Sequence, residues 1–270
     1  MKILWSHCKH TIKFSIGVLL MTNALAIGQV QENIVKKSQS TDLDGNGDID
    51  NIRAAFYYMG DGYSFNRVVL EVNGTFFVAK GSSIEPTLYI VDIDTIDSFK
   101  EIAIFDRGPS EDPETHFFRF ANGIIVDIDI VPGKTIGPPQ VSGTGKVHTS
   151  CRGTVLETWW YPCKFKLNRF SSRLEESVQH WKPMTAKVTL KTDLPLLTSP
   201  SLFPSPQSNR PADTLRAGDR ASILKTDDTN WCYIESENGS SGWFGLIGCC
   251  RIASNGLMAI EVFDGLRIAD

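Results

Sequence analysis

The sequence has no excess of basic residues and no apolar run long enough to cross a bilayer. It carries 27 Lys and Arg against 31 Asp and Glu, which gives a formal net charge of −4 at pH 7. The early apolar run at 14–21 is well short of the ~20 residues that a membrane span needs. Nucleic-acid phosphates require a basic stripe, and an acidic chain does not supply one. We therefore expect neither nucleic acid nor an inserted membrane segment among the partners of the mature chain.

Recognisable catalytic motifs are also missing. The segment Gly143-Thr144-Gly145-Lys146 resembles a phosphate-binding loop, but Val147 stands where a magnesium-binding hydroxyl is required. No Cys or Ser lies in a helix-opening segment of the kind that cysteine peptidases use, although His116, His148 and His180 could each act as a base. No His/Cys spacing suggests zinc. The sequence thus predicts no catalytic residue and a protein that is not an enzyme.

The first 26 residues have the layout of a cleaved secretory signal. Lys2, Lys9 and Lys13 precede the apolar run, and Ala24-Leu25-Ala26 supplies small residues at the positions that a signal peptidase reads. A single membrane anchor is the alternative, and the shortness of the run disfavours it. We predict a signal peptide at 1–26 and a secreted or periplasmic location.

Five cysteines follow the predicted cleavage site, and in an exported protein they are expected to form disulfides. Cys151 with Cys163 is the most natural local pair. Cys232 with either Cys249 or Cys250 is the second expected pair, which would leave one of the adjacent cysteines free or paired further away.

The fold class expected from the residue pattern is all-β. Short apolar runs alternate with turn residues, and Asn73-Gly74 is a strong signal for a hairpin. A short helix is predicted to begin at Ser172, with Glu175 completing its capping box, and a Pro/Ser-rich surface loop is predicted at 199–211. The predicted order is an acidic β domain at 40–170, a linker at 171–185, a small barrel at 186–250 and a strand extension at 251–270. Predicted strands cover 67–72, 75–79, 123–128, 186–190, 220–225, 230–236, 242–247 and 257–263.

The strongest local pattern is an acidic loop at 42–50. Oxygen donors recur at alternate positions, with glycines where the backbone must turn, and calcium prefers six to eight oxygen ligands. An EF-hand would need Glu at the twelfth position, where this sequence has Arg53. The oxygen donors of this pattern are Asp42, Asp44, Asn46, Asp48 and Asp50.

A second acidic segment begins fifty residues later and again leads into an apolar run. Its candidate metal ligands are Asp92, Asp94, Asp97 and Glu101, although the spacing between Asp94 and Asp97 departs from the first loop. Two such loops at a fixed interval indicate an internal repeat of blade-like units. The alternative for both loops is an acidic turn held by hydrogen bonds from the backbone.

The segment Asp-x-Asp-x-Asn-Gly-x-x-Asp at 42–50 resembles the calcium loop of FG-GAP or VCBS-type repeats, which occur in β-propellers and related exported proteins. Residues 91–115 are similar to a domain of this type in secreted bacterial proteins. The resemblance implies calcium as the cofactor, held at 42–50 and less securely at 92–101. In the first loop it implies Asp42, Asp44, Asn46 and Asp50 as ligands, with Asp48 contributing its side chain or only its carbonyl. It also implies that the ion stabilises the fold.

The C-terminal part resembles a bacterial SH3-type (SH3b) domain. The similarity covers Lys187 to Gly248 and is carried by Leu215-Arg216-Ala217-Gly218-Asp219, by Asn230-Trp231-Cys232-Tyr233-Ile234 and by Ser241-Gly242-Trp243-Phe244. It implies a five- or six-stranded barrel whose aromatic groove binds cell-wall peptide or a protein segment. Trp231, Tyr233 and Trp243 are the candidate ligand-binding residues, and core packing is the alternative role for each tryptophan.

Taken together, these patterns predict an exported, non-enzymatic binding protein of the bacterial cell envelope. A cell-wall hydrolase with unidentified catalytic residues is one alternative. An adhesion or interaction protein that uses the calcium-loop domain is another.

Overall fold

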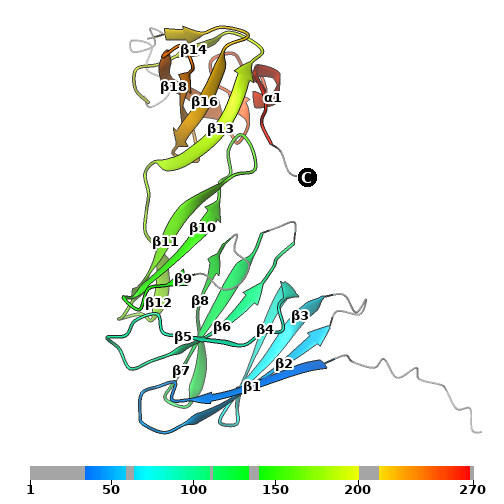
Figure 1. Cartoon of the computed structure of the whole chain (residues 1–270), viewed down its shortest axis with the longest axis vertical. Helices are drawn as coiled ribbons and strands as arrows, with labels where there is room; N and C mark the ends of the chain where they lie inside the picture. Colours follow the sequence, from blue (N-terminus) through cyan, green and yellow to red (C-terminus); the bar gives the residue numbers. More distant parts are fainter. Residues whose placement is uncertain (1–33, 59–63, 110–111, 134–139, 201–212, 268–270) are drawn as a thin grey trace, which may run out of the picture. The chain divides into compact units, whose positions relative to one another are not determined.

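The computed structural model describes residues 34–58, 64–109, 112–133, 140–200 and 213–267 (Figure 1). Residues 32–270 belong to one compact unit. The predicted signal peptide lies outside the described residues. The protein is all-β, as predicted, and α1 (Ala259–Val262) is the one helix in the described ranges. No helix among these residues has the length and apolar character of a membrane span.

The first sheet contains eight antiparallel strands and includes two meanders that follow each other in the sequence. In order, its main path is β1-β2-β3-β4-β6-β7-β8, and β5 pairs with β6. Each meander contains an Asn-Gly turn whose two residues both have positive φ, as a two-residue hairpin requires. The predicted hairpin at Asn73-Gly74 is confirmed, and Asn122-Gly123 forms its counterpart. The strands are β1 (Ile34–Thr41), β2 (Asp50–Tyr58), β3 (Phe65–Val72), β4 (Thr75–Ile84), β5 (Tyr89–Val91), β6 (Glu101–Asp106), β7 (Glu114–Ala121) and β8 (Ile124–Pro132).

Buried apolar side chains of this sheet belong to two separate clusters, one on each of its faces. Alternate residues of β2, including Ile52 and Phe56, join Phe118 of β7 in one buried cluster. Ala103 and Phe117 point the other way and belong to a second cluster that contains residues of the remaining sheets. Every residue of β6 is therefore buried, which places the acidic groups of this strand in a largely dry environment.

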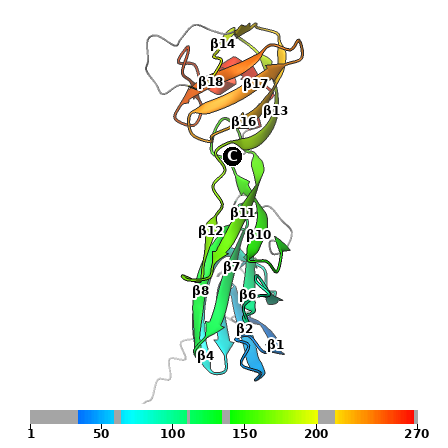
Figure 2. The ribbon, with the colours of Figure 1, turned by 90° about the vertical axis from the view of Figure 1, so that its left-hand side faces the viewer.

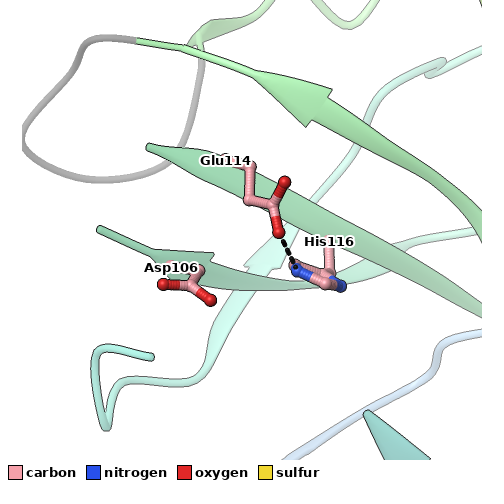
Figure 3. Close-up of side chains that lie close together, drawn as sticks. All are labelled: Asp106, Glu114 and His116. Atoms are coloured by element: carbon pink, nitrogen blue, oxygen red, sulfur yellow. Dashed lines mark hydrogen bonds and ion pairs between the residues drawn. The ribbon is translucent and has the colours of Figure 1, made fainter. Parts of the chain in front are cut away.

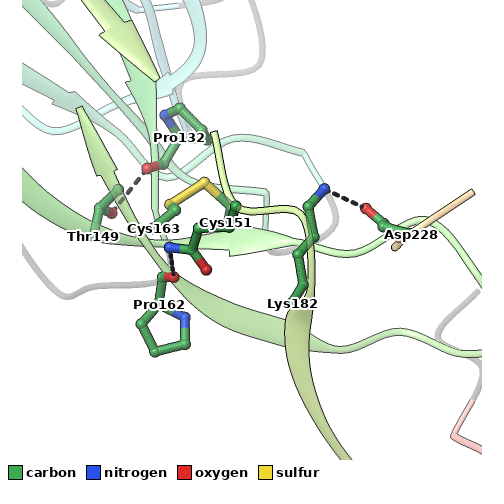
Figure 4. Close-up of a disulfide and its surroundings, with 8 residues drawn as sticks. Pro132, Thr149, Cys151, Pro162, Cys163, Lys182 and Asp228 are labelled. Atoms are coloured by element: carbon green, nitrogen blue, oxygen red, sulfur yellow. Dashed lines mark hydrogen bonds and ion pairs between the residues drawn. A yellow bond between two sulfur atoms is a disulfide. The ribbon is translucent and has the colours of Figure 1, made fainter. Parts of the chain in front are cut away.

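The second sheet holds four strands in the order β12-β11-β10-β9. Figure 2 shows β10, β11 and β12 of this sheet. These are β9 (Gln140–Val141), β10 (Lys146–Arg152), β11 (Trp160–Asn168) and β12 (Arg173–Glu176). Cys151 and Cys163 lie on neighbouring strands with their Cα atoms 5.8 Å apart, and their predicted disulfide is confirmed (Figure 4).

The helix predicted to start at Ser172 is wrong. Ser172 adopts a φ of 54° in a turn, and β12 follows it. Leu174 lies opposite Leu167 of β11 and is buried, so strand pairing buries the apolar side chain that the helical pattern relied on. The segment 171–185, predicted to be a linker, thus contributes β12 and the first residues of β13.

The C-terminal strands form a six-stranded sheet in the order β19-β18-β17-β16-β13-β20, accompanied by the hairpin β14-β15. An isolated bridge between Leu197 and Trp243 connects the hairpin segment to β18. The predicted loop at 199–211 falls largely outside the described residues. The strands are β13 (Lys182–Leu190), β14 (Leu194–Leu196), β15 (Asp213–Leu215), β16 (Arg220–Thr226), β17 (Trp231–Ser236), β18 (Ser241–Ile247), β19 (Arg251–Ile252) and β20 (Phe263–Asp264).

The strand predicted at 257–263 is also wrong. This segment forms α1 followed by β20. The Glu261 side chain accepts a hydrogen bond from the Met258 backbone at 2.7 Å, which supports the helical turn. Ala259 and Val262 are buried while Ile260 is exposed, a pattern that suits one helical turn better than the alternation of a strand.

Candidate functional site

The first acidic loop connects β1 to β2 and is shaped by its own side chains. Asp42 accepts hydrogen bonds from the backbone N–H groups of Gly45 at 2.7 Å and Gly47 at 3.0 Å. Both glycines have positive φ, which other residues adopt at a cost. The loop backbone therefore wraps around the Asp42 carboxylate.

Asp50 closes the loop from its far end. Its side chain is almost completely buried, with Oδ2 accepting the Leu43 N–H at 2.8 Å. The other oxygen, Oδ1, accepts the side-chain amide of Asn73 at 2.6 Å. Asn73 comes from the β3–β4 turn, so a residue of the first hairpin holds the last acid of the loop in place.

Three of the five predicted ligands of this loop converge. Asp42, Asp44 and Asp50 each offer a carboxylate oxygen, and these atoms all lie within 4.8 Å of one another. Asp48 is exposed and outside this group, while the Asn46 side-chain oxygen accepts the Asp48 N–H at 2.6 Å. Like charges this close repel, so a cation at their centre would relieve the repulsion.

The second acidic loop brings its acids against arginines. Asp94 has no exposed surface, and Arg169 donates to both of its oxygens, from Nε at 2.5 Å and from Nη2 at 3.0 Å. This paired guanidinium holds the pKa of Asp94 below its ordinary value. The negative charge of Asp94 is thus already matched within the chain.

Arg119 does the same for the remaining acids of the second loop. Its guanidinium donates to Asp97 at 3.1 Å and to Glu101 through Nε at 3.0 Å. Glu101 is fully buried, and desolvation raises its pKa, although the positive charge of Arg119 opposes this shift. Asp92 differs, because its Oδ1 is buried and has no hydrogen-bond partner among the described residues.

The two loops share one hydrogen-bonding scheme despite their different charge partners. The Leu43 N–H donates to Asp50, and in the second loop the Ile93 N–H donates to Glu101 at 3.0 Å. The first loop also packs directly on the second. A side chain at Gly45 would collide with Ser98, because an added Cβ would lie 2.2 Å from the Ser98 Cβ. The fifty-residue interval in the sequence therefore corresponds to two similar turns stacked on each other.

The three aromatic residues predicted to bind a ligand share one face of the C-terminal sheet. Tyr233 lies opposite Trp243, with ring centroids 5.1 Å apart, and Trp231 lies two residues before Tyr233 on the same strand. Trp181, just before β13, packs on Trp243 at 4.4 Å. Trp231 and Trp243 are each only 8% exposed, whereas Tyr233 and Trp181 are partly exposed. Core packing accounts for much of the surface of the two buried tryptophans.

A lysine completes this aromatic cluster, which we define as Trp181, Lys225, Tyr233 and Trp243. The Lys225 ammonium lies 4.9 Å from the centroid of the Tyr233 ring and 5.2 Å from that of Trp243. This geometry is that of a cation–π contact. The surface therefore offers partly exposed ring edges beside a positive charge.

The expected second disulfide is wrong. Cys232, Cys249 and Cys250 are free thiols. Cys232 points into the core of its sheet, opposite in parity to Trp231 and Tyr233, and burial raises its pKa to about 12. Cys249 is exposed. Because the Cys232 side chain is buried in the core, it does not form a disulfide with Cys249 or Cys250.

A further cluster was not predicted from the sequence. Asp106, Glu114 and His116 each offer a ligand atom within 4.8 Å of the others (Figure 3). They come from β6 and β7, and Glu114 lies directly opposite Asp106. A search for zinc spacing based on cysteine and histidine misses this group. The spacing of Glu114 and His116 by two residues was the one available signal.

Comparison with known proteins gave no support from relatives. No protein-family model matches the sequence, and a search of the curated proteins found no match.

Proposed function

We propose that this chain is an exported, non-enzymatic binding protein of the cell envelope whose fold is stabilised by calcium. The observation that carries the proposal is the convergence of Asp42, Asp44 and Asp50 in a loop whose backbone is already folded around them. Calcium prefers hard oxygen ligands in a flexible cage, and three carboxylates supply both the oxygens and the compensating charge.

In this proposal Asp42, Asp44 and Asp50 hold the ion, and Asn46 and Asp48 complete the set of donors. Bound calcium would cancel the repulsion among the carboxylates and tie the end of β1 to the start of β2. It would supply stability and no chemistry. The resemblance to FG-GAP and VCBS calcium loops supports this assignment.

The second loop needs no ion in this proposal. Arg169 and Arg119 already place positive charge against Asp94, Asp97 and Glu101. A second calcium would have to displace a guanidinium that makes two hydrogen bonds to a buried carboxylate. We therefore expect one calcium ion per chain.

Calorimetric titration tests this stoichiometry. Protein stripped with a chelator should bind one calcium ion, and Asp44→Asn should abolish the binding heat. Asp97→Asn, a charge-neutralising change in the second loop, is the matched control and should leave the titration unchanged. Binding of two ions, or equal binding by Asp44→Asn, would refute the assignment.

The proposed location is outside the cytoplasm. The Cys151–Cys163 disulfide is compatible with an oxidising compartment, and residues 1–26 have the pattern of a secretory signal.

We assign recognition to the C-terminal SH3-like module, with cell-wall peptide or a protein segment as ligand. The resemblance to SH3b domains supports this choice. Partly exposed aromatic edges at Tyr233 and Trp181 offer contact area at low entropic cost, and Lys225 could pair with a ligand carboxylate.

Co-sedimentation with purified peptidoglycan tests this part. The wild-type protein should pellet with the wall material, and Tyr233→Ala should remain in the supernatant. Phe170→Ala removes an aromatic ring that is fully exposed elsewhere, so it serves as the matched control and should pellet normally. Wild-type protein that stays in the supernatant would refute wall binding.

A further inference from the structure

The cluster Asp106–Glu114–His116 lies outside the calcium loop and the aromatic cluster. Asp106 ends β6, and Glu114 begins β7 as its direct cross-strand partner. His116 is two residues further along β7, so its side chain projects from the same face as that of Glu114. Figure 3 shows the three side chains gathered on this face. Two paired strands hold all three donors, which is a more rigid support than a loop.

The environment of Asp106 fixes its carboxylate in place. This residue is 1% exposed, and it accepts backbone N–H groups from Ser82 at 2.6 Å, Ser83 at 2.7 Å and Gly108 at 2.8 Å. The absence of a side chain at Gly81 permits this approach, because a Cβ there would lie 2.0 Å from the Asp106 Oδ2. An ionised carboxylate has about four acceptor positions, so one remains for another partner. Hydrogen bonds of this kind commonly orient carboxylates that bind metals.

The histidine is buried beside this carboxylate and in contact with another. His116 is 5% exposed, and its Nε2 lies 3.1 Å from the Glu114 Oε1. The Glu114 side chain is 37% exposed, so one of the three ligands faces solvent. An imidazole nitrogen with two carboxylate oxygens is a donor set that zinc accepts, and three protein ligands leave a position for water.

A fourth acid, on the neighbouring strand β8, lies outside this group of three. Asp127 lies opposite Phe118, whose ring stacks with that of His116, so it projects from the same face of the sheet. Its Oδ1 is buried without a hydrogen-bond partner among the described residues. A buried, unsatisfied carboxylate oxygen is costly unless a cation or donor compensates it.

We propose that Asp106, Glu114 and His116 form a binding site for a divalent transition-metal ion, with zinc as the natural probe. Two ligands of a tetrahedral zinc ion lie about 3.4 Å apart when each is ~2.1 Å from the metal. The donor atoms lie within 4.8 Å of one another, so modest side-chain rotations suffice to close the site. The ion would replace the hydrogen bond between His116 and Glu114. This site is independent of the calcium loop.

The test is a zinc titration of the full chain, stripped of metal, by calorimetry. The wild type should bind one zinc ion at this site. His116→Gln keeps a side-chain amide that can still donate to Glu114, yet it should weaken zinc binding by more than the about 10- to 100-fold that loss of an outer-sphere partner costs. His148→Gln changes an exposed histidine on β10 and should bind zinc as the wild type does.

Two further measurements keep the outcome interpretable. Melting of His116→Gln without zinc should match the wild type, and Glu114→Gln, at a more exposed position, provides a second test if it does not. Asp44→Asn should retain zinc binding, which separates this site from the calcium loop. Absence of zinc binding by the wild type, or unchanged binding by both His116→Gln and Glu114→Gln, would overturn the proposal.

Discussion

The most direct test of the proposed calcium site is to neutralise one of its three converging acids without changing the shape of that side chain. The Asp44 Oδ1 accepts the Asn46 N–H at 3.2 Å. An asparagine oxygen can accept the same bond, so Asp44→Asn removes charge while preserving the local turn. The loop should fold as before without calcium and lose its affinity for the ion.

The expected size of the effect follows from the linkage between binding and folding. Calcium sites of extracellular modules have dissociation constants of about 0.1–1 mM. At about 10 mM calcium, binding would then add ~1.4–2.7 kcal/mol to the free energy of unfolding. For a protein of this size each kcal/mol raises the melting temperature by about 2–4 °C, so calcium should raise it by roughly 3–11 °C.

Thermal melting of chelator-stripped protein, with and without added calcium, measures this rise. Asp44→Asn should lose most of it. Without calcium, the variant should melt at or slightly above the wild type, because one of three mutually repelling carboxylates is gone. Magnesium, which demands stricter octahedral geometry, should give a smaller rise. A wild-type melting temperature that calcium does not change would refute the reasoning, as would a variant that retains the full rise.

Three further predictions concern the core and the cysteines. Arg119→Met leaves Glu101 buried without its ion pair and should cost about 3–5 kcal/mol of unfolding free energy at pH 7. Burial raises the folded-state pKa of Glu101 above its unfolded value, so the folded state binds the proton more tightly. The loss of unfolding free energy caused by Arg119→Met should therefore shrink as the pH falls toward 4. Urea unfolding that shows the same loss at pH 7 and at pH 4 would contradict this. Replacing Cys151 and Cys163 together by serine removes a crosslink between residues 12 positions apart and should lower the free energy of unfolding by about 3 kcal/mol. An unchanged midpoint of urea unfolding would contradict this. Cys232, whose thiol is buried with a pKa of about 12, should resist alkylation in native protein and react in denaturant, which mass spectrometry can follow; rapid native modification would show that the thiol is accessible.

Local patterns predicted the parts of the fold that depend on neighbours in the sequence. Short apolar runs indicated β3, β4, β8, β13, β16, β17 and β18. Asn73-Gly74 indicated a hairpin because both of its residues tolerate positive φ. Cys151 and Cys163 were a reasonable pair because a short hairpin brings them together. The same local reasoning failed at Leu174, where pairing with Leu167 decided between helix and strand.

The candidate sites were likewise predictable only where their residues are neighbours in the sequence. The donors of the first acidic loop lie within nine consecutive residues, so the sequence predicted a common site for all five of them. Asp42, Asp44 and Asp50 do converge, whereas Asp48 lies outside their group. The cluster at His116 was missed because a spacing of two residues gains meaning only when the neighbouring strand and its register are known. Strand register depends on the packing of the whole sheet.

The sequence by itself determined which acids share a turn, since each acidic loop is a short continuous segment with glycine or polar residues at its bends. Only the tertiary structure decided which arginine forms an ion pair with each acid of the second loop. Arg119 reaches Glu101 from 18 residues away, and Arg169 reaches Asp94 from 75 residues away. Arg119 lies on β7, directly opposite Glu101, and Arg169 lies in the turn after β11. No local sequence pattern indicates such a pairing, and it is the physical difference between two loops that look alike in sequence.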